Sequence, residues 1–437
     1  MFELSWKIAI YGSSALLLYL VTGDVYRSYY DLYPYQGRWL FQQIALNEKY
    51  GPIVRVGPDE IHISDPKFYD TAFGTAKKRR DKSMTWYWFV GGGTNIDGSA
   101  FGTLSQEQHA IRRSAMNPSF SMKKGSQVIR KGNTDMPVDI ISEYSFGKAV
   151  GLLDTGTLGS EMRNMFEQGI KIHPFARQFR LVTVSMMRVM TSLAHYVGSM
   201  ISVLEFDNLM DKLAKETHDR ALQAYEKHDE DRSRSIIESM VNDPHLSPSD
   251  REYKRIRAEA ANLIGAGTET TARTLAVGLY YVLADRDVHK KLLAELRTII
   301  PSLTSKIPST IELSKLPYLT ACIHESTRLA RGVAGHLVRI APDADLVCNG
   351  YTIPRGSTFS MSHYIQHMDP EYFPEPTKFK PERYLGDEAT VRETMRNLVP
   401  FGRGQRACLG MYLAWSEMYL TIAYLIGGLK LELFETT

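Results

Sequence analysis

The sequence has few cysteines and no strong excess of charge of either sign. Its 437 residues include three cysteines, Cys322, Cys348 and Cys408, and none of them belongs to a C-x-x-C pair. A zinc ribbon and a disulfide framework are therefore excluded, and unpaired thiols are typical of a reducing compartment. Lys and Arg number 52 against 49 Asp and Glu. No basic face interleaved with aromatic residues occurs, which argues against a nucleic-acid-binding protein.

Long hydrophobic runs are also scarce, and the run at the N-terminus is short. Residues 8–21 are apolar apart from Tyr, Ser and Gly, with Lys7 before them and Asp24 after them. A helix that spans a bilayer needs about 20 residues, and no signal-peptide cleavage site of small residues follows this run. We expect residues 1–25 to form a single-pass membrane anchor, with an amphipathic surface helix as the alternative. Residues 26–437 are then expected to form one catalytic domain.

Helical periodicity dominates the rest of the chain. Helices are predicted over residues 26–50, 104–116, 250–285, 287–300, 317–330 and 411–426, and mostly helical patterns over residues 135–226. Alternation around turns predicts a hairpin at residues 52–64 and short strands between residues 337 and 359. Residues 363–384 lack periodicity and are predicted to form an ordered meander without a helix. The predicted fold class is mainly α with small β-sheets.

The centre of the longest predicted helix conflicts with helix propensity. Gly265, Gly267 and a cluster of threonines lie there, and each of these residues lowers helix propensity. Such a conflict inside a helix indicates a functional or strained site. Gly265 and Gly267 lack the preceding strand and the third glycine of a dinucleotide-binding motif. The glycines at 91–93 lack the Lys-Ser/Thr that follows in a phosphate-binding loop. Dinucleotide binding and a phosphate-binding loop are therefore excluded.

The stretch from Phe401 to Gly410, FGRGQRACLG, sets a cysteine among glycines and arginines just before a predicted helix. Free N–H groups and the positive end of a helix dipole stabilise a thiolate. We therefore expect the pKa of Cys408 to be lowered and its sulfur to be nucleophilic or metal-binding. Arg406 can face an anionic group of the molecule that the sulfur holds. The alternative is a buried structural cysteine in an ordinary glycine-rich turn.

Five residues of this stretch fit the pattern F-x-x-G-x-R-x-C-x-G, namely Phe401, Gly404, Arg406, Cys408 and Gly410. By average residue usage, a chance match in a chain of this length is on the order of one in ten thousand. The stretch resembles the cysteine-ligand loop of the cytochrome P-450 haem-thiolate monooxygenases. The resemblance implies a haem b cofactor contacted by Phe401, Gly404 and Arg406, with Cys408 as the axial metal ligand. Electron donation from such a thiolate promotes O–O cleavage.

The sequence Ala266-Gly-Thr-Glu-Thr270 resembles the oxygen-activation site of the same family. The resemblance implies catalytic roles for three of its residues. Gly267 would allow a helix kink with room for O₂ and a water, and Thr270 would supply a hydroxyl that donates to the bound oxygen. Glu269 would supply a carboxylate that relays protons. The alternative is an ordinary helix with surface Glu and Thr.

Two more sets of residues follow the order found in the family. Glu325-Ser-Thr-Arg328 followed by Pro381-Glu-Arg383 implies a buried structural triad of Glu325, Arg328 and Arg383, although an i,i+3 Glu–Arg pair alone is commonplace on a helix. The resemblance also implies that the haem propionates are bound by a second set, Arg406, Arg113, His109 and Arg339. In this second set a histidine replaces the family's usual tryptophan.

The resemblance runs from about residue 26 to the end of the chain, and details such as Met368-Asp-Pro-Glu-Tyr-Phe-Pro resemble the fungal trichodiene-oxygenase-like branch. We therefore expect a monooxygenase that inserts one oxygen atom of O₂ into an apolar secondary-metabolite intermediate of the terpenoid class. Electrons are expected from NADPH through an NADPH-cytochrome reductase that docks near Lys123, Lys124 and Arg403. The expected location is the endoplasmic reticulum membrane, with the catalytic domain in the cytoplasm.

Two other functions remain as alternatives. One is a haem-thiolate isomerase or dehydratase without O₂ activation, against which the Glu269–Thr270 pair argues. The other is an inactive, truncated homologue, because three family segments are expected to be missing: a proline-rich hinge after the anchor, a helix between Lys123 and Pro137, and the C-terminal hairpin. We thus expect a cytochrome P-450 fold without one helix and that hairpin, and a shortened core leaves apolar faces unburied.

Overall fold

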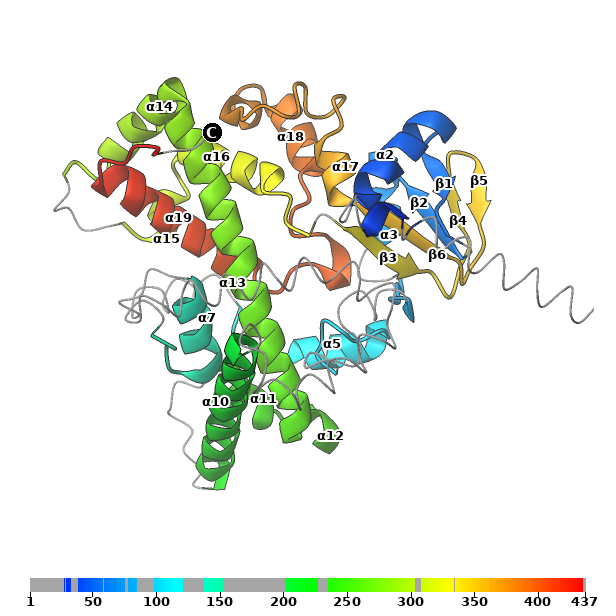
Figure 1. Cartoon of the computed structure of the whole chain (residues 1–437), viewed down its shortest axis with the longest axis vertical. Coiled ribbons are helices and arrows are strands. Elements are labelled where there is room, and N and C mark those ends of the chain that lie inside the picture. Colours follow the sequence, from blue (N-terminus) through cyan, green and yellow to red (C-terminus); the bar gives the residue numbers. More distant parts are fainter. Residues whose placement is uncertain are drawn as a thin grey trace, which may run out of the picture.

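The structure, a computed structural model, describes residues 27, 29–32, 38–57, 59–74, 78–84, 98–120, 137–151, 201–226, 235–302, 308–333 and 335–434. Helices make up most of this part of the chain. The strands gather beside α2 (Trp39–Tyr50), at one side of the molecule (Figure 1). The predicted fold class, mainly α with small β-sheets, is therefore confirmed.

The longer helices after α2 are α5 (Gln106–Ser114), α7 (Pro137–Phe146), α10 (Ile201–Glu226), α13 (Tyr253–Ala284), α14 (Arg286–Arg297), α16 (Pro317–Leu329), α18 (Glu388–Asn397) and α19 (Met411–Gly428). The short ones are α3 (Tyr69–Phe73), α11 (Ile236–Val241), α12 (Pro248–Arg251), α15 (Thr310–Leu313) and α17 (His363–His367). The described residues also form the 3-10 turns η1 (Pro66–Phe68), η4 (Pro381–Tyr384) and η5 (Gly404–Arg406). The predicted helices at 104–116, 250–285, 287–300, 317–330 and 411–426 are confirmed within a few residues at each end.

A mixed sheet joins residues 53–63 to residues 336–362. Its strands are β1 (Ile53–Arg55), β2 (Glu60–Ile63), β6 (Thr358–Ser362) and β3 (His336–Ile340), in that spatial order. The predicted hairpin is confirmed, because β1 pairs antiparallel with β2. Strand β6 pairs in parallel with β2 and antiparallel with β3, and it is buried along its whole length. A separate hairpin pairs β4 (Leu346–Cys348) with β5 (Tyr351–Ile353).

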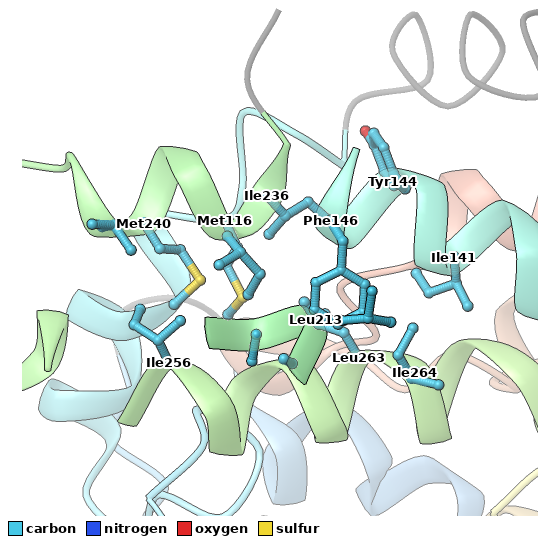
Figure 2. Close-up of a cluster of buried hydrophobic side chains, with 14 of the residues drawn as sticks. Met116, Ile141, Tyr144, Phe146, Leu213, Ile236, Met240, Ile256, Leu263 and Ile264 are labelled. Atoms are coloured by element: carbon cyan, nitrogen blue, oxygen red, sulfur yellow. The ribbon is translucent and has the colours of Figure 1, made fainter. Parts of the chain in front are cut away.

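The long helix α13 passes through the middle of the helical part (Figure 1). Its N-terminal half packs against α7, α10 and α11 through a cluster of buried apolar side chains (Figure 2). The labelled members of this cluster are Met116, Ile141, Tyr144, Phe146, Leu213, Ile236, Met240, Ile256, Leu263 and Ile264. The C-terminal half of α13 contributes to a second cluster with α14, α16 and α19. The helix therefore links two apolar cores.

The prediction that residues 363–384 contain no helix is wrong at both ends of that segment. Helix α17 directly follows β6, and the 3-10 turn η4 closes the segment. The helix α17 buries four of its five side chains, among them two histidines. Polar residues therefore occupy buried positions, so that apolar periodicity carries no signal here.

Among the residues that the structure describes, no helix combines the length and the apolar character needed to cross a membrane. The expected anchor at residues 1–25 lies outside the described residues and stays a prediction. The segment between Lys123 and Pro137, where a family helix is expected to be missing, also lies outside them.

Candidate functional site

The loop at residues 401–410 leads directly into α19 and places Cys408 just before the first turn of that helix. The backbone N–H of Cys408 donates to the carbonyl of Phe401 at 2.7 Å, and that of Ala407 donates to the carbonyl of Gly404 at 3.1 Å. Gly402 and Gly404 have φ angles of 67° and 72°, in the left-handed region that favours glycine. The loop is therefore held by its own backbone hydrogen bonds.

Gly404 meets a second constraint from its surroundings. A Cβ at this position would lie 2.5 Å from the carbonyl oxygen of Gly74 and 2.6 Å from that of Phe73. Both contacts are backbone atoms next to α3 and cannot rotate away. The predicted importance of this glycine thus has a packing reason: it lets the cysteine loop lie directly on the end of α3.

We expect Gly404→Ala to lower the free energy of unfolding by at least about 2 kcal/mol, since it combines a positive φ with a backbone clash. The matched control is Gly350→Ala, because Gly350 has a φ of 80° and open space around its Cβ position. Urea unfolding of both variants measures the difference. Equal losses in the two variants would show that the contact with α3 contributes nothing.

The expectation that the pKa of Cys408 is lowered is wrong in direction. The side chain reaches accessible space, but surrounding protein shields the sulfur from bulk water, and this burial raises the pKa of the Cys408 thiol. The N–H of Gly410 and the charge of Arg113 act in the opposite direction but are weaker. The free thiol is therefore protonated at neutral pH, and a metal ion would have to displace its proton to bind.

A cluster of five basic side chains lies next to this loop. It consists of Lys82, His109 and Arg113 on α5, Arg339 on β3, and Arg406 in η5. Burial lowers the pKa of Arg339 to about 10 and that of Arg406 to about 9. Burial, followed by repulsion from Arg339 and Arg406, holds the pKa of Lys82 well below its usual value. Such mutual repulsion indicates a site built for an anion.

Two polar atoms of this cluster support the same conclusion. The Nδ1 atom of His109 and the Nε atom of Arg406 are buried without a hydrogen-bond partner in the described part of the chain. Burial, together with the surrounding cations, lowers the pKa of His109 to about 2, so its ring is neutral. A buried polar atom without a partner is costly. The donors and charges beside Cys408 therefore fit haem, whose propionates are anionic and whose iron takes a thiolate.

The remaining donors of these side chains bind backbone carbonyls. Arg113 donates to Ala407 at 2.5 Å, which ties α5 to the cysteine loop. Arg339 donates to its neighbour Val338 at 2.8 Å, and its guanidinium lies over the Phe73 ring. The structure thus brings all four predicted propionate ligands together. It adds Lys82, which the sequence reasoning missed because the residue lies in a loop without periodicity or motif.

Helix α13 carries the predicted oxygen-activation residues in an unbroken helix. Ala266 and Thr270 are exposed although they lie in mid-helix, and Glu269 is half-buried. The Thr270 hydroxyl donates to the carbonyl of Ala266 at 2.8 Å. This bond between residues one turn apart leaves the hydroxyl on the accessible face. Thr270 is therefore placed to exchange its carbonyl partner for a ligand.

Gly267 lies elsewhere on the same helix. A Cβ at this position would be 2.8 Å from Cγ1 of Ile141 on α7. The glycine thus faces the contact between α13 and α7, and the described helix shows no interruption there. Close helix packing explains this glycine in the structure, and its role in admitting O₂ stays a prediction.

A buried acid on α19 was also missed by sequence reasoning. Glu417 is buried, and this burial raises its pKa to about 8, although a hydrogen bond with Thr271 on α13 opposes the shift. The carboxyl is therefore mostly protonated at neutral pH. In the sequence, Glu417 could have been noticed only as a single acidic residue within an otherwise apolar helix.

The predicted structural triad comes together between α16 and η4. Arg328 donates to both carboxylate oxygens of Glu325, at 2.7 and 2.8 Å, and Arg383 donates to the same carboxylate at 3.1 Å. Glu325 and Arg328 are fully buried. Tyr384 adds a hydroxyl donor at 3.0 Å, and Lys380 a backbone N–H at 2.9 Å. The carboxylate therefore accepts from five donor groups.

The expected reductase-docking residues are placed only in part. Arg403 donates to Asp70 on α3 at 2.7 Å and also to the carbonyl of Arg396. Lys123 and Lys124 lie outside the described residues.

Phe401, which was predicted to contact the haem, is half-buried, and its ring lies 5.7 Å from that of Trp415 on α19.

Comparison with known proteins identifies relatives along most of the chain. A family model described as Cytochrome P450 matches residues 110–437. The cytochrome P450 monooxygenase ucsK of Acremonium sp is 38% identical over 448 residues, which cover 94% of this chain and 85% of that protein. The tryptophan 6-hydroxylase fscE of Fusarium equiseti is 32% identical over 450 residues, covering 94% and 84%. The fusicoccadiene C-8 hydroxylase of Phomopsis amygdali is 30% identical over 438 residues, covering 92% and 82%. Each alignment is longer than the chain, so each relative has residues where this chain has none.

Proposed function

The chain belongs to the cytochrome P450 family, and from this premise we propose that it oxidises an apolar intermediate of fungal secondary metabolism with one oxygen atom of O₂. The enzyme is an oxidoreductase of the monooxygenase class. The observation that carries the site assignment is the cluster of buried basic side chains beside Cys408. Their positive charge is complementary to the negative propionates of a haem. Electrons come from a redox partner, which we propose to be an NADPH-dependent reductase.

Each residue around the cysteine has a defined task in this proposal. When bound, haem supplies the iron centre that activates O₂. Cys408 would hold the metal as a thiolate after loss of its thiol proton, and the nearby charge of Arg113 favours the thiolate. His109 and Arg406, whose ring Nδ1 and guanidinium Nε atoms have no partner in the described part of the chain, would hold the propionates. Lys82 and Arg339 add two buried basic side chains to the same cluster.

Thr270 and Glu269 move protons on the α13 side of the site. The Thr270 hydroxyl, now bonded to Ala266, rotates to donate to an oxygen atom in the adjacent accessible space. The half-buried carboxyl of Glu269 carries a proton from solvent to that hydroxyl. The presence of this pair supports oxygen activation over the isomerase or dehydratase alternative.

The substrate class is proposed from chemistry and from the relatives. The fusicoccadiene hydroxylase supports a terpenoid substrate. The tryptophan 6-hydroxylase, at similar identity, supports an indole as the second candidate. A panel of terpenoid, polyketide and indole compounds, each titrated into the haem-loaded enzyme while the Soret band is followed, separates these classes. The terpenoid proposal fails if the indoles alone displace the Soret band.

Thr270→Ala is expected to keep haem but to uncouple NADPH oxidation from product formation. Product per NADPH should fall at least about tenfold, because one proton donor is lost, while hydrogen peroxide rises. The panel compound with the largest spectral shift serves as substrate. The matched control is Thr268→Val, since the Thr268 hydroxyl makes the same kind of bond to Ile264 but is buried. Undiminished product in Thr270→Ala, or turnover without NADPH, would contradict a monooxygenase that uses this pair.

A further inference from the structure

A row of aromatic rings, which we call the ring bridge, connects the cysteine loop to the triad of Glu325. The Phe401 ring lies 5.7 Å from that of Trp415 on α19. The Trp415 ring lies 4.9 Å from that of His324 on α16 and nearly perpendicular to it, and the His324 ring lies 5.3 Å from that of Tyr384. These separations fall in the range of roughly 4.5–7 Å in which aromatic pairs attract each other.

Hydrogen bonds attach the two ends of the ring bridge to the sites on either side. At one end, the carbonyl of Phe401 accepts from the backbone N–H of Cys408 at 2.7 Å. At the other end, the Tyr384 hydroxyl donates to the buried carboxylate of Glu325 at 3.0 Å. A continuous series of direct contacts therefore runs from that carboxylate to the backbone of Cys408.

The middle of the ring bridge is held by ring packing and carries no charge. Trp415 packs against the second apolar cluster, which α14, α16 and α19 share. Burial lowers the pKa of His324 to about 4, so its ring is neutral at pH 7. The Nδ1 atom of His324 is buried without a hydrogen-bond partner among the described residues. His324 thus supports Trp415 through the contact between their rings.

We propose that Trp415 and His324 are positioning residues that hold the Phe401 ring in place and thereby fix the loop that presents the Cys408 sulfur to the haem iron. This inference rests on the proposed haem site. Both residues act through Phe401. A fixed ring keeps the carbonyl of Phe401 where it accepts from the Cys408 N–H, and this bond sets the position of the cysteine. Without the ring bridge, the loop loosens and the sulfur leaves the iron more often.

The test follows how fast the reduced protein with carbon monoxide loses its thiolate-type Soret band in a fixed, low concentration of urea. Trp415→Leu removes the ring between Phe401 and His324, and we expect the band to be lost at least about tenfold faster, the equivalent of one aromatic pair. Trp415→Phe keeps a ring there and should stay within about twofold of the wild-type rate. His324→Ala should resemble Trp415→Leu, whereas His324→Phe should resemble the wild type.

A second measurement needs no haem. Of the three cysteines, Cys408 is the one whose side chain reaches accessible space, so iodoacetamide should alkylate it first in the haem-free full-length chain. Mass spectrometry of the peptide that contains Cys408 gives the rate. Alkylation should be faster in Trp415→Leu and in His324→Ala than in the wild type, because the loop is held less firmly.

The control is His218→Ala, which removes a similar contact between a histidine and an aromatic ring. The His218 ring on α10 lies 5.9 Å from that of Tyr253 on α13, at 76°, and its loss should change neither rate. If Trp415→Leu does not fold, His324→Ala takes its place. An unchanged rate in either measurement would overturn the proposal, as would an equal acceleration in the control. Failure of the proposed function would appear separately, as wild-type protein without haem.

Discussion

Replacing Cys408 by alanine is expected to abolish the thiolate-type Soret shift that carbon monoxide produces in the reduced protein. Of the three cysteines, Cys408 is the one whose side chain reaches accessible space, whereas Cys322 and Cys348 are buried in apolar clusters. The backbone bond from Cys408 to Phe401 does not use the sulfur, so the loop should keep its shape. The cation cluster should still attract the propionates. We therefore expect residual haem binding without the thiolate spectrum.

The measurement is the difference spectrum of the reduced protein with and without carbon monoxide, together with haem content per chain. Cys348→Ala is the matched control. It removes another cysteine, which lies in β4 and outside the loop at residues 401–410, and it should keep the thiolate spectrum. A wild-type protein without the shift, or a shift that survives in Cys408→Ala, would contradict the assignment of the ligand. Loss of the shift in Cys348→Ala would show that the spectrum reports folding alone.

Local patterns predicted the elements that carry the chemistry. The helix α13 and the hairpin of β1 and β2 follow from periodicity and turn residues within a few positions. The grouping of Cys408 with Arg113 and Arg339 came from the resemblance and not from spacing, since these residues come from a loop, a helix and a strand far apart in the chain. These residues come together only when the chain folds, so their spacing in the sequence cannot predict the contacts between them.

Other features depend on contacts that no local pattern encodes. The parallel pairing of β2 with β6 joins segments separated by most of the chain. Lys82 can be assigned to the candidate haem site only because Arg339 and Arg406 lie near it in the folded chain. The pKa of Cys408 was predicted in the wrong direction, since the favourable helix end was visible in the sequence and the burial was not. Burial by distant segments thus decides the chemistry of a motif that is itself local.

Glu325→Gln is expected to lower the free energy of unfolding by about 3–5 kcal/mol, the cost of leaving a buried charge without its partner. Arg328 is fully buried, and both of its bonds to Glu325 need carboxylate oxygens. A glutamine turns one acceptor into a donor that faces the donors of Arg328 and Arg383. Urea unfolding measures the loss, and the carbon monoxide spectrum measures its effect on the site.

The triad should also matter to Cys408, because its arginines hold part of the segment that precedes the cysteine loop in the chain. Arg328 donates to the carbonyls of His367 and Pro376 at 2.9 and 2.6 Å, and Arg383 donates to that of Glu375 at 2.8 Å. Glu325→Gln should therefore release this segment and lower haem retention as well as stability. The control is Arg392→Ala, which removes an exposed ion pair with Glu388 on α18 and should cost less than about 0.5 kcal/mol. A loss in Glu325→Gln as small as in this control would mean that the buried carboxylate is dispensable, because water or relaxation of the segment compensates for its charge.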